Sequence, residues 1–216
     1  MLNLLQCISL CILSAASSQP APVAIEPARA PITWELNIRF QDPQRVSVVL
    51  PDKAEPVVYW YMLYTVENPS DQEVDFYPDF ELVTNTLRVV QSEIQVSPEA
   101  FRAIQRRSGD PLLIPPERVI GKLLRGKDRA RHSVAIWKDF DLKATSFTVF
   151  VSGLSGEMKR VKNPAFDANK PESRTNERYF TFRKTLSIPY KFPGSAVTRD
   201  RVAPERLADK QQWIMR

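Results

Sequence analysis

Apolar and polar residues alternate along much of the chain. The alternation is regular over 34–41 and again over 45–50, and the turn signal Asp42-Pro43 separates the two stretches. A period of two is typical of a strand that buries one face. The sequence therefore predicts two half-buried strands in this region.

The stretch 57–67 is apolar on both faces and carries four aromatic residues: Tyr59, Trp60, Tyr61 and Tyr64. A strand of this composition is covered on both sides, so we predict a central strand here. Aromatic residues favour strands, and the first interpretation of the four rings is that they belong to the core. The alternative is a platform on which sugar rings or bases stack.

Further strands are predicted where the apolar rhythm returns, over 74–84, 87–96, 132–138, 146–152 and 180–192. Pro189 lies in the last of these and requires an outer strand or a bulge. A short helix interrupts the series, because Ser97 is a typical N-cap, Pro98 suits the first helical position and Glu99 places an acid in the first turn. One more turn of helix is predicted over 117–124.

These elements amount to about eight strands with one short helical insertion, which predicts a mainly β protein. Strands that do not alternate with helices argue against a βαβ fold, and their order and spacing favour an immunoglobulin-like, Greek-key β-sandwich. The domain is expected over 32–192, with a basic helical insertion at 98–131 and a polar loop at 155–177. A C-terminal tail over 193–216 follows, and its apolar Trp213 docks either on a partner or on the protein's own sheet.

The first residues have the pattern of an export signal. A short apolar run and then small residues occupy 1–18, a length typical of a signal peptide and too short to span a bilayer. A linker rich in Pro and Ala is expected over 19–31. Both cysteines, Cys7 and Cys11, lie in the leader, so the mature chain is expected to have no disulfide and no Cys-ligated metal. We therefore expect an exported protein, located in the periplasm, at the cell surface or outside the cell.

A strand-turn-strand arrangement recurs in the chain. The run 64–70 (YTVENPS) leads through a turn to a strand ending at 80–82, and a loop at Gly126 leads into 135–137 and then 147–151. This arrangement resembles that of bacterial envelope immunoglobulin-like modules over roughly half of the chain. The resemblance implies a fold class, together with a role in adhesion, assembly or spacing, and it does not imply an activity.

The net charge of +5 permits an anionic partner without requiring one. Positive charge is concentrated in the insertion, which has nine cations: Arg102, Arg106, Arg107, Arg118, Lys122, Arg125, Lys127, Arg129 and Arg131. Only Asp110, Glu117 and Asp128 oppose them there. One interpretation is a solvated insertion whose acids come from elsewhere in the fold. The other is an anion-binding patch for phosphate, polysaccharide or an acidic protein.

Other residues that carry chemistry are few. Asp139 and Asp141 are two positions apart, as are Asp79 and Glu81, and on a strand each pair shares a face that suits glycoside hydrolysis or calcium. We interpret the first pair as a turn after a strand. His132 is the only histidine, and no nucleophile motif accompanies it. The chain has no phosphate-binding Gly loop, dinucleotide fingerprint or zinc spacing, so no cofactor is expected.

The function expected from the sequence is that of a non-catalytic structural or protein-binding module of the cell envelope, with a protein partner and without a transmembrane span. The first alternative is a binder of anionic polymer through 102–131. The second is a hydrolase of cell-wall or glycan material, which requires a cleft lined by Asp79, Glu81 or Asp139.

Overall fold

The computed structural model describes residues 34–194 and 202–216, so the signal peptide and linker expected over 1–18 and 19–31 lie outside the described residues. Within them the protein is mainly β, as predicted, with thirteen strands rather than about eight. Three of the additional strands, β10, β12 and β13, come from segments expected to be a loop and a tail.

The first sheet is built on β3 (Val57–Glu67). β8 (Arg131–Lys138) pairs with one edge of β3, while β1 (Asn37–Phe40) and β2 (Gln44–Val48) pair in succession with the other edge. All of these pairs are antiparallel. The central position predicted for 57–67 is therefore confirmed.

The second sheet runs from β6 through β5 and β9 to β11. β10 follows β9 along one edge of β11, and β12 and β13 occupy the other edge. The strands of this sheet are β5 (Asp79–Thr84), β6 (Val89–Gln91), β9 (Ser146–Ser152), β10 (Met158–Lys162), β11 (Tyr179–Lys191), β12 (Glu205–Arg206) and β13 (Gln212–Met215). A separate antiparallel pair consists of β4 (Val74–Phe76) and β7 (Gly121–Leu123).

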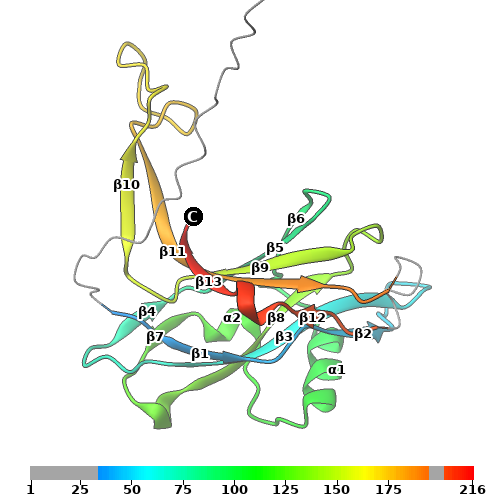
Figure 1. Ribbon diagram of the computed structural model, residues 1–216. Coiled ribbons are helices and arrows are strands. Elements are labelled where there is room, and N and C mark those ends of the chain that lie inside the picture. The colour runs from blue at the N-terminus through cyan, green and yellow to red at the C-terminus, as the bar shows by residue number, and fades with distance from the viewer. Residues whose placement is uncertain (1–33, 195–201) are drawn as a thin grey trace, which may run out of the picture.

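The two sheets face each other across one hydrophobic core (Figure 1). Alternate residues of β3, β5, β8, β9 and β11 enter it, as the period of two requires. The ring of Tyr64 lies 4.7 Å from that of Phe80 in the opposite sheet, and Phe147 stacks on Tyr190 at 5.1 Å. Aromatic pairs at this spacing contribute about 0.5–1.5 kcal/mol each beyond the burial of their area.

Helix α1 (Pro98–Ser108) covers the outer face of the first sheet. Its buried Ala100 and Ile104 pack with Tyr59 and Tyr61, which point away from the main core. The side chain of Ser97 accepts a hydrogen bond from the backbone N–H of Ala100 at 3.1 Å, so the predicted N-cap is confirmed. All four aromatic residues of β3 are buried, which confirms the core interpretation and removes the exposed platform.

The remaining helical elements are short: α2 (Pro116–Val119) and the 3-10 turns Lys127–Arg129 and Ala208–Lys210. α2 overlaps the start of the turn of helix predicted over 117–124, and β7 occupies 121–123 of that segment. Among the described residues, no helix has the length and apolar composition needed to cross a membrane.

Several boundaries differ from the prediction. The stretch 74–84 divides at Pro78 into β4 and β5, which belong to different sheets, and 87–96 is reduced to β6. The segment 155–177, expected to be a polar loop, contains β10. The described part of the tail returns to the protein's own sheet, where Met215 is buried and Trp213 is half-buried.

Pro189 lies inside the second sheet rather than on an outer strand. Its carbonyl oxygen accepts a hydrogen bond from Leu207 at 2.9 Å, on the side of β11 that β12 and β13 occupy. The N–H and C=O of a strand residue point the same way, so the missing N–H of the proline faces the break between these two strands. No strand residue lies opposite the proline nitrogen in this break, so the missing N–H costs the sheet no backbone hydrogen bond.

Candidate functional site

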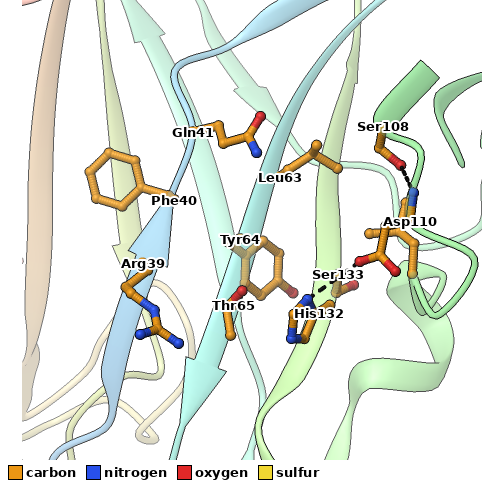
Figure 2. Close-up of a pocket in the computed structure, with 11 residues that line it drawn as sticks. Arg39, Phe40, Gln41, Leu63, Tyr64, Thr65, Ser108, Asp110, His132 and Ser133 are labelled. Atoms are coloured by element: carbon orange, nitrogen blue, oxygen red, sulfur yellow. Dashed lines mark hydrogen bonds and ion pairs between the residues drawn. The ribbon is translucent and has the colours of Figure 1, made fainter.

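A pocket of about 220 Å³ opens on the outer face of the first sheet, beside α1 (Figure 2). Its floor comes from β1, β3 and β8. Its wall comes from the end of α1 and the loop that follows, through Ser108, Asp110 and Leu113. α1 covers only the first part of β3, which leaves this part of the sheet open.

The floor of the pocket is a row of three side chains from three strands. Arg39 of β1 pairs with Thr65 of β3, and Thr65 pairs with His132 of β8. Directly paired residues of antiparallel strands place their side chains on the same face, with Cβ atoms about 4.5–5.5 Å apart. Tyr64 and Val66 enter the core, so Thr65 and its two neighbours face outward.

His132 is held by Asp110. Its Nδ1 lies 3.3 Å from Oδ2 of Asp110, and Oδ1 of the same carboxylate accepts the N–H of Leu112 at 2.8 Å (Figure 2). The carboxylate is therefore fixed by the loop and directs Nδ1 of the ring toward itself. Nε2 is the ring nitrogen left for a ligand.

Three polar side chains of the pocket, those of Arg39, Gln41 and Thr65, form no hydrogen bond or ion pair with any described residue. Sequence reasoning singled out His132 but not these three. Arg39 and Gln41 occupy ordinary polar positions of the alternating stretch 34–41, and Thr65 lies in a stretch read as a covered strand, so no local signal marks any of the three.

The nine cations of the insertion divide into separate groups. Arg102, Arg106 and Arg107 lie on α1, where Arg102 is 3.8 Å from Glu99 and Arg107 donates to the backbone oxygen of Arg45 at 3.2 Å. Arg118 is exposed on α2. The α1 group lies at the start of β3, against Tyr59 and Tyr61.

The remaining cations lie near the other end of β3. Lys122 is 3.4 Å from Glu73, Arg125 donates to the backbone oxygen of Asp71, and Lys127 and Arg129 form the 3-10 turn between them and β8. Arg131 is half-buried and donates to the backbone oxygen of Val119 at 2.6 Å, so it holds the insertion together.

The length of β3 separates the two groups. Asn68, which follows β3 and accepts the N–H of Gly126, is seven residues beyond Tyr61, roughly 20–25 Å at the rise of a strand. α1 and the β4–β7 pair also lie at opposite ends of the molecule in Figure 1. The structure does not bring the nine cations together into one patch.

The carboxylate pairs are placed differently from each other. Asp139 accepts a hydrogen bond from Nε1 of Trp60 at 2.8 Å and lies 3.5 Å from Arg45, in the turn after β8. Asp79 and Glu81 share a face of β5 and line a hollow of about 240 Å³. Such a hollow is what the hydrolase hypothesis requires.

The two carboxylates of this hollow have unequal surroundings. Burial raises the pKa of Asp79, and the charge of Glu81 adds to the effect. Glu81 pairs with Arg216 and also accepts from the side chain of Gln91 at 2.7 Å. Among the described residues, Asp79 has no hydrogen bond or ion pair from its side chain, whereas Glu81 is held by Arg216 and Gln91. The two carboxylates thus differ in the sense that separate acid and base roles require.

A two-stranded arm leaves the body of the protein. The first residues of β11 pair only with β10, and this hairpin projects from the two sheets (Figure 1). It exposes three large apolar side chains: Met158, Tyr179 and Phe180. Sequence reasoning began the last strand at Phe180 but took 155–177 as a loop, because that segment is long, polar and rich in turn residues.

The tip of the arm has its own hydrogen-bond network. The side-chain nitrogen of Asn176 donates to the backbone oxygens of Asp167, Lys170 and Pro171, and Asn163 donates to Glu177. Arginines cover two of the rings, with Arg178 5.1 Å from Phe166 and Arg160 5.1 Å from Tyr179. The arm is therefore an ordered surface.

The described residues contain no cluster of three or more His, Cys, Asp or Glu side chains that could hold a metal ion. The comparisons do not add a function: no family model, no curated protein and no solved structure matches the chain. The pocket beside α1 presents polar side chains without a partner among the described residues, and the β10–β11 arm presents exposed apolar side chains.

Proposed function

We propose that this chain is an exported, non-catalytic, immunoglobulin-like module of the cell envelope that binds a protein partner through the β10–β11 arm. The observation that carries the proposal is the arm itself. A hairpin that leaves the core and presents Met158, Tyr179 and Phe180 to solvent adds nothing to the packing of the two sheets.

The composition of the arm suits a protein interface. Tyrosine and arginine are enriched among the residues that contribute most to binding energy, and both lie here beside exposed apolar side chains. The segment 158–183 has seven lysines and arginines against three acids, which favours an acidic partner surface. The ordered tip lowers the entropy lost on binding.

Two further observations support the rest of the proposal. The apolar run and small residues of 1–18 support export, and both cysteines lie in that segment. The shared core between two antiparallel sheets supports a sandwich of the immunoglobulin-like type.

Site-directed photocrosslinking tests the arm. A photoreactive phenylalanine analogue replaces Tyr179 or Phe180 in the mature protein, which is then irradiated with envelope fractions of the source cell. We expect a discrete adduct of one mass at both positions. Replacing Arg160 and Arg178 with Ser is expected to weaken the adduct, because the partner surface is acidic.

The matched control places the same analogue at Leu142, which is 67% exposed and lies outside the arm. No adduct of that mass is expected there. Adducts of equal yield at Leu142 and Phe180, or none at any position, would show that the arm is not a binding surface.

Export has its own test. Finding the unprocessed protein in the cytosol would contradict the proposed location.

A further inference from the structure

We propose that the pocket beside α1 binds a small oxyanion, a carboxylate or a phosphate group, between Arg39 and His132. This surface is separate from the β10–β11 arm, and the inference does not depend on the proposed function. It rests on the row Arg39–Thr65–His132, on the fixed carboxylate of Asp110 and on the unused donors that line the hollow.

The first step concerns the guanidinium of Arg39. It lines the pocket and forms no ion pair with a described residue. The acid that lines the same pocket, Asp110, is already bound by His132 and by the N–H of Leu112. Arg39 also borders a neighbouring hollow with Glu35, which pairs with Lys184, and with Glu67, and no ion pair joins Arg39 to either acid. Its guanidinium is therefore open to a ligand, and planar guanidinium groups bind carboxylate and phosphate in a bidentate manner.

The second step concerns spacing. β1 and β8 are separated by β3, so their backbones lie two interstrand spacings apart, about 10 Å. When an oxyanion accepts one hydrogen bond on each side, the two donor atoms lie about 8 Å apart. This length is the sum of two charge-assisted bonds of about 2.8 Å each and the separation of the two oxygens. Arg39 and His132 line the same pocket with Thr65 between them, so a bound oxyanion would lie over the hydroxyl of Thr65.

The third step concerns the imidazole of His132. With Nδ1 directed at Asp110, a neutral ring offers only an acceptor at Nε2, whereas a protonated ring offers a donor there. The charged groups that line the pocket around it are Arg39 and Asp110. An anion that contacts Nε2 therefore binds the form of the ring that carries a proton on both nitrogens.

The fourth step concerns the ligand. The pocket is small, and its free donors are the guanidinium of Arg39, the hydroxyl of Thr65 and the amide of Gln41. This set complements three or four oxygens that carry one or two negative charges. The shared chemistry is an oxyanion, and it fits a free phosphate as well as the carboxylate end of a larger molecule.

The test uses the fact that His132 is the only histidine of the chain, so its ring signals in an NMR spectrum need no further assignment. Inorganic phosphate and acetate are titrated separately at pH 6.5 and constant ionic strength, with chloride as the balancing ion. We expect a saturable shift of the His132 ring signals with at least one of the two anions. Saturation by phosphate alone assigns a phosphate ligand, and saturation by both assigns a general oxyanion site.

Two variants complete the test. Arg39→Gln is expected to weaken binding at least fivefold. Arg88→Gln, which removes an exposed arginine between β5 and β6, is expected to leave it unchanged. Arg39 is exposed, so its replacement leaves the fold intact, and the remaining spectrum checks this. A shift that follows ionic strength without saturating, or one that is equal in Arg39→Gln and the parent, would overturn the proposal.

Discussion

Nζ of Lys184 lies 2.6 Å from Oε2 of Glu35, across 149 positions of sequence. The same nitrogen is 3.5 Å from Glu157 and 5.1 Å from the centre of the Trp213 ring. Lys184 and Glu157 are almost fully buried, with side chains 10% and 6% exposed. One ammonium group thus joins the start of the described chain, the base of the β10–β11 arm and the C-terminal strand.

Replacing Lys184 with Met is expected to lower the free energy of unfolding by about 3 kcal/mol or more, because it leaves the buried carboxylate of Glu157 without a counter-ion. Replacing Glu157 with Gln is expected to change it by less than about 1 kcal/mol, since Lys184 keeps Glu35 and one oxygen of Glu157 has no hydrogen-bond partner. Urea unfolding measures both. The control is Lys191→Met, whose ion pair with Glu205 is half exposed, and an equal loss in the two lysine variants would refute the argument.

Stability is expected to fall steeply above pH 10. Burial raises the pKa of Tyr64, and burial together with the charge of Asp42 raises the pKa of Tyr190. A phenol whose pKa is raised in the folded state contributes stability that is complete below its unfolded pKa of about 10 and is lost above it, at about 1.4 kcal/mol per pH unit for each group.

Urea unfolding at pH 9, 10 and 11 measures this loss. The double variant Tyr64→Phe, Tyr190→Phe removes both phenols, so its stability is expected to depend less on pH over the same range. Absorbance at 295 nm gives a second readout, because these two tyrosines are expected to ionise only as the protein unfolds. A pH dependence identical in the parent and the double variant would show that other groups control alkaline unfolding.

Gly153→Ala is expected to destabilise the protein by more than 2 kcal/mol. Gly153 has a φ of +81°, and a Cβ atom there would lie 2.2 Å from the backbone oxygen of Tyr77. Both the left-handed backbone and the contact oppose a side chain. Thermal unfolding measures the loss, and Gly109→Ala, where φ is +68° but no atom lies within 4 Å, separates the contact from the backbone effect.

Ser97→Ala is expected to cost about 1 kcal/mol, because the N–H of Ala100 loses the oxygen that caps it. Circular dichroism followed through urea unfolding measures the loss. Ser97→Asp restores an acceptor at the same position and is expected to recover most of the stability. If Ser97→Asp is no more stable than Ser97→Ala, the cap is not the source of the effect.

The strands that bury one face were visible in the sequence, because burial of alternate side chains leaves a period of two. β3 was also predictable, since α1 and the second sheet together require apolar residues on both of its faces. β10 left no such trace, because the arm is open to solvent and Lys159, Arg160 and Lys162 need no alternation. The division of 74–84 at Pro78 depends on which sheet each half joins, and tertiary packing decides this rather than the local sequence.

The pocket was beyond sequence reasoning for a related reason. Arg39, Thr65 and His132 become neighbours only through the register of β1, β3 and β8, and register between distant strands is set by the packing of whole sheets. In the basic insertion the relation between sequence and space is the opposite. Its cations are close in sequence, but the length of β3 separates them in space.

β11 is one unbroken strand from the arm into the second sheet, so a pull applied to the arm is transmitted lengthwise into the sheet. There the strand is bonded to β9 on one side and to β12 and β13 on the other. Tension along a strand loads its lateral hydrogen bonds together in shear instead of opening them one after another. A partner held by the arm would therefore be anchored through several rows of backbone bonds at once, which is an arrangement that withstands mechanical load.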